Sequence, residues 1–386
     1  MNILLLAPQP FYSERGTPIA ILNLAKVLGE AGHQIDLVTF PGGVDVDIPN
    51  TRIIRTWRMP FIKKIPVGFS PQKILYDLLL LGISLRKTLG KRYDVIHANE
   101  ETVYIGMALA PLRRSKLIYD MDSSLSDQLV EKWPALNAIK GFFNWFEGLA
   151  VKRADRVIAV CPALREIAER YDSNTPVDVL EDVIMDEKGH DDGAAENLRT
   201  YLPDDGKLML YVGNLEHYQG VDLVIEAMAS GDIHEKLHFL VIGGMVENDL
   251  ERCKTLSHQL GIADKVFFLG PRPVTHLMAY LEQADILVSP RTKGVNTPMK
   301  IYSYLGAGVP IVATDIPSHT QVLNDDNACT VDATPAALVV GINRVLDDEA
   351  YGQKLGENAK REAEERFSFN AFRKQLNHIY TQLEQE

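Results

Sequence analysis

One loop of this 386-residue chain brings two cations next to several small polar side chains. Arg291 follows an apolar, strand-like run, and Lys300 lies in the helical run that comes next. Asn296 or Thr297 would cap this helix, with Pro298 as its first residue, where a missing N–H costs nothing. Unpaired N–H groups at a helix start, beside two cations, suit a phosphate or diphosphate. An ordinary loop whose cations face water is the alternative.

The first half of the chain offers polar residues where strand-like runs end. Gly16 and Thr17 lie in the first loop, His97 lies near the end of one run, and Asp120 and Asp122 end another. Such an Asp pair can grip a divalent ion, but the phosphate-type loop lies far downstream in a second half, so no metal is expected. Gly16 alone is equally compatible with a tight turn, and a lone histidine is more often packed or capping than functional.

Alternating apolar and helical runs must position these residues. The first unit of this kind is a strand at 2–7, a helix at about 19–31 and a strand at 34–40. In the second half, strands are expected at 208–213, 237–242, 265–270, 286–288 and 310–312. Such an alternation of apolar strands and helices is typical of parallel sheets covered by helices, so an α/β fold is predicted. The expected parts are a domain at 1–185, a linker region at 186–207, a second domain at 208–365 and a terminal helical segment at 366–386.

Composition narrows the class of protein. The length suits two domains, and the formal net charge of −12 argues against non-specific nucleic-acid binding. The three cysteines match no metal or redox spacing, which indicates reduced thiols in a cytoplasmic protein. The start, MNILLLAPQP, is expected to be a first strand rather than a signal peptide, and no apolar run is long enough to span a bilayer.

The segment 52–92 is basic in an otherwise acidic chain. It mixes ten Lys and Arg residues, Lys63 and Lys64 among them, with one acid, Asp77, and with aromatic and aliphatic side chains such as Trp57. This mixture favours contact with an anionic membrane surface, and hence a lipid-linked acceptor and a peripheral location at the inner face of the membrane. A core helix at 75–85 with solvated charges is the alternative.

The stretch 286–314 resembles the donor-site signature of GT-B glycosyltransferases of retaining family 4. The matching residues are Ser289-Pro290, Pro298-x-Lys300, Tyr304, Gly308-x-Pro310 and Ile311-Val312-Ala313. The resemblance implies two Rossmann-like domains facing a central cleft, a nucleotide diphosphate sugar as co-substrate, and neither metal nor other cofactor. It also implies that His97 and the position of Asp122 lie at the cleft, and that Gly16 and Thr17 lie across it from the donor.

The chain departs from that family at several expected donor contacts. Asn214 and Gln219 stand where the family has Arg and Lys on the diphosphate, Ser303 stands where a Glu binds the ribose, and Asp122 stands where a His faces the sugar. The electrostatic role therefore moves, as a hypothesis, to Arg291 and Lys300. The residues expected to bind the donor are Gly16, Thr17, Gly213, Asn214, Glu216, Gln219, Gly243, Arg272, Asn296, Thr297 and Ser303; those expected in the chemistry are His97, Asp122, Arg291 and Lys300.

The function predicted from this resemblance is sugar transfer, with retention, to a glycan or lipid-linked acceptor in cell-surface polysaccharide or glycolipid synthesis. Two rivals stay open at this point. One is a non-catalytic binding protein on the same fold, which the substituted donor contacts motivate. The other is a sugar-nucleotide epimerase of the GT-B type, which would release a product that keeps its nucleotide.

Overall fold

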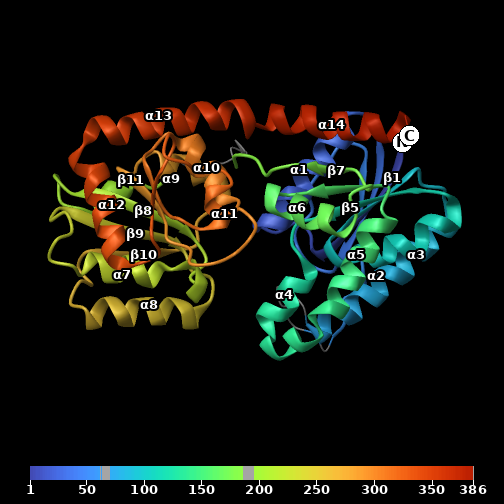
Figure 1. Cartoon of the computed structure of the whole chain (residues 1–386), viewed down its shortest axis with the longest axis horizontal. Helices are drawn as coiled ribbons and strands as arrows, with labels where there is room; N and C mark the ends of the chain where they lie inside the picture. The colour runs from blue at the N-terminus through green and yellow to red at the C-terminus, as the bar shows by residue number, and fades with distance from the viewer. Residues whose placement is uncertain (61, 63–69, 186–194, 386) are drawn as a thin grey trace. The chain divides into compact units, whose positions relative to one another are not determined.

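The computed structural model describes residues 1–60, 62, 70–185 and 195–385. Lys63, Lys64 and the 186–194 part of the expected linker lie outside the described residues. The chain divides into two compact units, which Figure 1 shows coloured along the chain. Unit 1 comprises Met1–Glu181 and Phe372–Glu386, and unit 2 comprises Asp182–Ala371.

Unit 1 is built on a parallel sheet of seven strands in the order β3-β2-β1-β4-β5-β6-β7. Short apolar runs form the central strands because both faces of the sheet are covered. The elements are β1 (Asn2–Pro10), α1 (Gly16–Glu30), β2 (Gln34–Phe40), β3 (Thr51–Arg55), α2 (Pro71–Gly90), β4 (Val95–Asn99), α3 (Val103–Arg113), β5 (Lys116–Met121), α4 (Leu125–Lys132), α5 (Lys140–Arg153), β6 (Arg156–Ala159), α6 (Pro162–Tyr171) and β7 (Val177–Val179), joined by the last helix, α14 (Phe369–Gln385).

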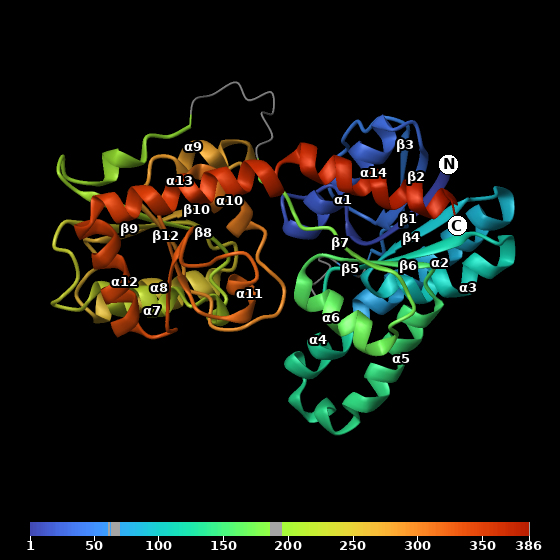
Figure 2. The same cartoon turned by 45° about the horizontal axis from the view of Figure 1, so that its top comes forward.

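The helices of unit 1 lie in two layers. Figure 2 shows α1 and α14 on one side of the sheet and α2, α3, α5 and α6 on the other. Tyr76 and Leu80 of α2 pack into the second layer with α3 and α5 residues, while Leu78 and Leu89 of the same helix are more than half exposed. Helix α2 therefore contributes to the core, as the alternative for 75–85 expected, and also presents apolar side chains outward. Contact of this segment with a membrane surface stays a prediction.

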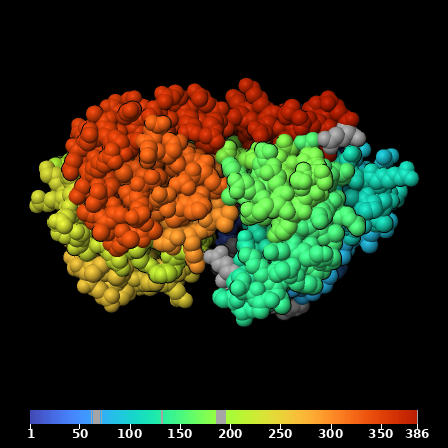
Figure 3. All heavy atoms as spheres, in the orientation of Figure 1, coloured from blue at the N-terminus to red at the C-terminus, as the bar shows by residue number. Residues whose placement is uncertain are grey.

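Helices α4 and α5 form a projection at the surface of unit 1, which the space-filling view of Figure 3 shows from outside. Phe142 and Trp145 of α5 are each more than half exposed, although both contact Phe146 edge to face. No helix among the described residues has the length and apolar character needed to cross a membrane.

Unit 2 holds a second parallel sheet, of six strands in the order β10-β9-β8-β11-β12-β13. Successive strand residues serve opposite faces: Leu208 and Leu210 pack toward α9, α10 and α13, whereas Met209 and Tyr211 pack toward α7 and α12. The elements are β8 (Lys207–Gly213), α7 (Val221–Met228), β9 (Leu237–Gly243), α8 (Glu247–Gln259), β10 (Val266–Gly270), α9 (Leu277–Leu281), β11 (Ile286–Ser289), α10 (Lys300–Ala307), β12 (Ile311–Thr314), α11 (Pro317–Thr320), β13 (Cys329–Val331), α12 (Pro335–Asp347) and α13 (Glu349–Arg366).

Two helix starts differ from the sequence prediction. Helix α1 begins at Gly16, three residues earlier than expected, because Ile19 N–H already donates to the Arg15 carbonyl. Helix α10 begins at Lys300 rather than Pro298, after a residue, Met299, that makes no side-chain cap. The prediction of Asn296 or Thr297 as cap was therefore wrong.

Candidate functional site

The carboxyl ends of β8, β9, β11 and β12 share one edge of the sheet of unit 2, because all these strands are parallel. The turns that leave β8 and β9 touch each other there. Gly213 has φ 148° and Gly243 has φ 122°, and a Cβ added to Gly243 would collide with the Gly213 carbonyl. Only glycine fits such a turn, so the two loops can approach closely at this edge of the sheet.

Lys300 reaches from the start of α10 to the β8 turn. Its ammonium nitrogen lies 3.9 Å from the centre of the Tyr211 ring and would lie 3.3 Å from a Cβ added to Gly213. Burial, and next the charge of Arg291, hold the pKa of Lys300 well below its usual value. An anion bound at this turn would offset both effects.

Arg291 is held rigidly beside Lys300. Its guanidinium donates to the carbonyls of Lys293 (2.8 Å) and Asn296 (3.1 Å) and lies 5.3 Å from the centre of the Tyr218 ring. Gly294 leaves room for it, since a Cβ there would overlap the guanidinium. The side chain is 9% exposed, so the predicted pair of cations does not point into bulk solvent.

Asn296 and Thr297 take other positions than those of helix caps. Asn296 contributes its backbone carbonyl to Arg291. Thr297 is 4% exposed, and its hydroxyl has no hydrogen-bond partner within the described part of the chain. A buried hydroxyl without a partner carries a cost of about 1–3 kcal/mol, which a bound acceptor oxygen would remove.

Both halves of the chain match models of known protein families. Residues 196–362 match the family model described as "Glycosyl transferases group 1", and residues 15–181 match the "Glycosyl transferase 4-like domain". This chain is a GT-B glycosyltransferase of the family 4 type.

The glycosyltransferase also resembles individual proteins along nearly its whole length. An uncharacterized glycosyltransferase of Methanocaldococcus jannaschii is 25% identical over 95% of this chain and 94% of its own. Among solved structures, sucrose-phosphate synthase from Thermosynechococcus elongatus has a TM-score of 0.82 at 21% identity, covering 99% and 98% of the two chains. HepE of Anabaena, solved in complex with UDP-glucose, has a TM-score of 0.75 at 17% identity, covering 99% and 100%. The two-domain α/β fold predicted from the sequence is confirmed.

A second layer of the site, around His319, was not predicted from the sequence. His319 Nε2 lies 2.9 Å from Ser289 Oγ, and its Nδ1 lies 2.9 Å from the Thr314 carbonyl. The Thr314 hydroxyl in turn donates to the Arg291 carbonyl. Burial lowers the pKa of His319 to about 4, so a neutral ring joins the ends of β11 and β12 behind Arg291. In the sequence, the one indication of this layer is Ser289 at the end of a strand. Its partner His319 lies 30 residues further along the chain, so no local pattern connects the two.

The other residues predicted on the donor side are spread over unit 2. Asn214 and Glu216 are exposed in the turn after β8, where the Asn214 carbonyl accepts a hydrogen bond from the Tyr211 hydroxyl (2.6 Å). Gln219 is partly buried, with its side-chain oxygen 3.4 Å from the same hydroxyl. Arg272 is tied by two hydrogen bonds, of 3.1 and 3.0 Å, to Glu196.

Ser303 is not at the open edge. Its side chain is fully buried, and its hydroxyl accepts the Met185 N–H at 3.1 Å. Ile184 covers the next turn of α10, where it would contact a Cβ added to Gly306. The segment before the 186–194 stretch thus occupies the position that the family pattern gives to the ribose contact, and binding of the ribose by Ser303 stays a prediction.

In unit 1, the residues predicted near the sugar form one polar chain. Tyr380 OH lies 2.8 Å from His97 Nδ1, and His97 Nε2 lies 3.3 Å from Asp120 Oδ2. Asn99 Nδ2 donates to both Asp120 (3.1 Å) and Asp122 (3.0 Å). His97 is fully buried, whereas Asp122 is partly exposed, so only Asp122 of the two predicted residues reaches the surface.

Gly16 and Thr17 form the first turn of α1. The preceding residue, Arg15, makes no side-chain cap, and a Cβ added to Gly16 would meet nothing within 4 Å. Gly16 has no positive φ either, so packing does not explain a glycine here. An uncapped helix start with open space before it fits the predicted contact to a ligand.

The loop that carries Asp122 is anchored by Glu147 of α5. This fully buried carboxylate accepts hydrogen bonds from the hydroxyls of Ser124 (3.0 Å), Ser126 (2.9 Å) and Tyr171 (2.9 Å) and from the Leu125 N–H (2.6 Å). Four donors satisfy a buried charge, so the start of α4 is fixed next to Asp122.

Several carboxylates surround Lys73 where β4 ends and α2 begins. Lys73 Nζ lies 2.5 Å from Glu101 and 3.7 Å from Glu100, with Asp77 one helical turn further on. Burial, followed by the neighbouring carboxylates, raises the pKa of Asp77 and of Glu100 to about 7. Among the described residues, no group of three or more His, Cys, Asp or Glu is placed to hold a metal ion.

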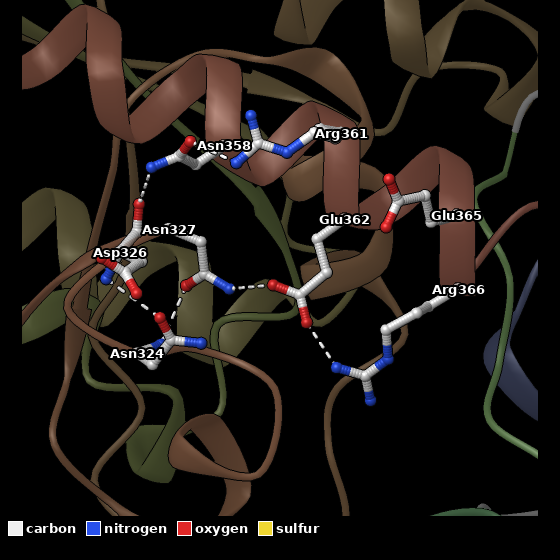
Figure 4. A pocket seen from close by; sticks show the side chains of 8 residues that line it. All are labelled: Asn324, Asp326, Asn327, Asn358, Arg361, Glu362, Glu365 and Arg366. Carbon is white, nitrogen blue, oxygen red and sulfur yellow. Dashed lines mark hydrogen bonds and ion pairs between the residues drawn. The ribbon is translucent and has the colours of Figure 1, made fainter.

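A polar pocket of about 440 Å³ lies elsewhere in unit 2, between α13 and the loop before β13 (Figure 4). Its side chains largely bond one another: Asn327 donates to Glu362 (2.7 Å), which pairs with Arg366, and Arg361 donates to Asn358 (2.6 Å). None of the residues predicted to bind the donor lines this pocket.

Proposed function

We propose that this glycosyltransferase moves a sugar from a nucleotide diphosphate sugar, with retention of configuration, to a glycan or lipid-linked acceptor of cell-surface polysaccharide or glycolipid synthesis. The pair of cations at the sheet edge of unit 2 carries the proposal. Departure of the nucleotide develops negative charge on the diphosphate, and fixed cations stabilise such charge without reorganisation. Lys300 and Arg291 supply the positive charge that Asn214 and Gln219 do not.

The glycine turn after β8 supports the same proposal. Because Gly213 has no side chain, its backbone lies next to the Lys300 ammonium, and a diphosphate held by that ammonium would also meet the main chain. The buried Thr297 hydroxyl gives a further donor close in sequence to Lys300. The complex of HepE with UDP-glucose, on the same fold, agrees with a nucleotide sugar as donor.

In unit 1, we assign Asp122 to the sugar or the acceptor hydroxyl, and His97 to positioning. His97 is buried and acts on Asp122 only through Asp120 and Asn99. Gly16 and Thr17 would add backbone N–H groups from the start of α1. The two cations take the part that a metal has in other transferases, so we propose that transfer persists when a chelator is present.

A screen of UDP-, GDP- and ADP-sugars by thermal shift, followed by calorimetry, tests the donor proposal. One nucleotide sugar is expected to bind in the micromolar range and to raise the melting temperature. Lys300→Met should weaken that binding at least about tenfold, since a charged hydrogen bond to phosphate contributes about 1.5–3 kcal/mol. Lys254→Met, at a partly exposed lysine of α8, is the matched control.

Two results would count against the proposal. One is that no nucleotide sugar binds below millimolar concentration. The other is that Lys300→Met binds the donor as tightly as the unmodified protein. Incubation with the donor alone separates transfer from epimerisation, because an epimerase would return a sugar that is still attached to its nucleotide.

A further inference from the structure

A groove of about 950 Å³ runs along unit 1 between the edge strand β3 and helix α2. Five cationic side chains line it, against the single acid Asp36. That acid is already satisfied, since it accepts a hydrogen bond from Tyr93 (2.5 Å) and lies 3.5 Å from Lys87 Nζ. In a chain of net charge −12, such a groove is locally positive and attracts anions.

The cations of the groove differ in how far they are already used. Arg55 donates to the carbonyls of Phe11 and Val44 and pairs with Asp45, so it is part of the fold. Arg52 and Arg86 are exposed and, within the described residues, pair with no carboxylate. Lys91 is exposed too and lies over the Tyr93 ring, 5.1 Å from its centre. These last three cations remain available for an anionic ligand.

The walls of the groove are apolar. Ile54 lies on the strand side, and Leu78, Leu79 and Ile83 lie on the helix side. Trp57 at its end is 86% exposed, and Leu78 is 59% exposed. Gly82 lies in the middle of the helix wall, where an added Cβ would meet nothing within 4 Å, so the absence of a side chain there widens the groove.

We propose that this groove binds one anionic phospholipid of a membrane surface, with the phosphate among Arg52, Arg86 and Lys91 and part of an acyl chain against the apolar walls. A purely charged partner would leave the exposed Trp57 and Leu78 without a role, and an uncharged apolar partner would leave three cations without one. The site deepens the proposed function, since it rests on a lipid-linked acceptor at a membrane, but it belongs to unit 1, whereas the donor edge belongs to unit 2.

Flotation with vesicles tests the site. Vesicles of phosphatidylcholine with about one third phosphatidylglycerol should bind the protein, and vesicles of phosphatidylcholine alone should not, with binding weakened by high salt. Gly82→Leu fills the groove without changing charge and should lower binding about tenfold. Arg86→Glu combined with Lys91→Glu should lower it further, because each cation near the surface contributes and each new carboxylate repels.

Matched controls separate the groove from the rest of the protein surface. Lys152→Glu with Arg170→Glu makes the same charge change at exposed cations outside the groove and should leave binding intact. Gly231→Leu adds a leucine at another glycine with open space around it. Circular dichroism should show Gly82→Leu folded, since glycine in a helix interior is less favourable than residues with side chains.

Three outcomes would overturn the inference: binding that survives Gly82→Leu, equal binding to uncharged vesicles, or loss in both control variants. Thermal shift with the nucleotide sugar is measured on every variant and should be unchanged. If vesicles bind but no nucleotide sugar does, the proposed donor fails and the groove stands. If the donor binds but vesicles do not, the groove fails alone.

Discussion

At the scale of single residues, Lys300 is a side chain whose proposed binding role opposes stability. Burial and Arg291 depress the pKa of its ammonium, so the unfolded chain binds that proton more readily than the folded one. Stability from this group therefore rises as the pH rises toward 10.5, and the penalty is larger at neutral pH than at alkaline pH. A ligand anion would remove the penalty, whereas an empty site retains it.

We expect Lys300→Met, without ligand, to raise the free energy of unfolding by about 1 kcal/mol at neutral pH, because it removes a desolvated charge. Urea unfolding followed by circular dichroism measures this change. Lys254→Met should leave stability within about 0.5 kcal/mol. A destabilised Lys300→Met protein would mean that the ammonium serves the fold rather than a ligand.

The raised pKa of Asp77 predicts that the stability from this group falls as the pH rises, opposite to the contribution of Lys300. Its pKa is raised to about 7, so the folded state binds a proton that the unfolded state releases near pH 4. Stability from this group is present at low pH and is lost as the pH rises to 7. Asp77→Asn should therefore match the unmodified protein near pH 4 and exceed its stability near pH 8, by on the order of 2–4 kcal/mol, since each pKa unit corresponds to about 1.4 kcal/mol. Equal gains at both pH values would contradict this assignment.

His319 acts in the lower part of the pH range. Its pKa of about 4 lies below the ordinary 6.5, so the folded state resists protonation, and stability falls as the pH drops from 6.5 toward 4. The loss approaches about 1.4 kcal/mol per pH unit in that window. His319→Gln should be less stable at pH 7, by about 1–2 kcal/mol for its buried hydrogen bonds, and should lose less on acidification. Thermal melts at several pH values compare the two proteins.

At the scale of elements, Glu147 joins α5 to the start of α4 and to the loop with Asp122. Glu147→Gln replaces an acceptor oxygen by an amide NH₂ that must face donors, and we expect a loss of about 1–3 kcal/mol. Tyr171→Phe removes one of the four bonds and should cost about 1 kcal/mol. Urea unfolding of both variants compares the two losses of stability. A larger loss for Tyr171→Phe than for Glu147→Gln would contradict the role of the carboxylate as the anchor.

The elements themselves were largely predictable, because apolar runs of parallel strands and helical periods are local properties of the sequence. β2 at 34–40 was predicted with the limits that the structure shows. The edge strand β3 was missed, since its residues TRIIR alternate charge with aliphatic side chains inside a segment dominated by cations. The start of α10 was misplaced, because Thr297 is drawn into the interior instead of capping the helix.

At the scale of the whole molecule, unit 1 is assembled from two distant parts of the chain. Leu376, Ile379 and Tyr380 of α14 are buried against unit 1, and Arg373 pairs with Glu30 at 2.6 Å. We expect Leu376→Ala to cost about 2–5 kcal/mol in unit 1. Hydrogen exchange should then speed up in β4 and β5 and stay unchanged in β8 and β11. Equal acceleration in both sheets would show that the units unfold together.

The candidate site was predictable only where its parts are close in sequence. Arg291 and Lys300 lie within one loop and helix, and their proximity followed from that spacing. Tyr380 lies 283 residues from the His97 it contacts, and Met185 lies 118 residues from Ser303. Such pairings depend on how the sheets and covering segments pack, and no local pattern encodes them.

The placement of α14 in unit 1 has a consequence for biosynthesis. A nascent chain leaves the ribosome N-terminus first, so the first 181 residues emerge long before the helix that covers one face of their sheet. Until translation has passed Tyr380, α1 is the helix that covers that face, and His97 lacks its phenol partner. The half of the enzyme that is synthesised first is thus the half that is finished last, and chaperones have the longest opportunity to engage it there.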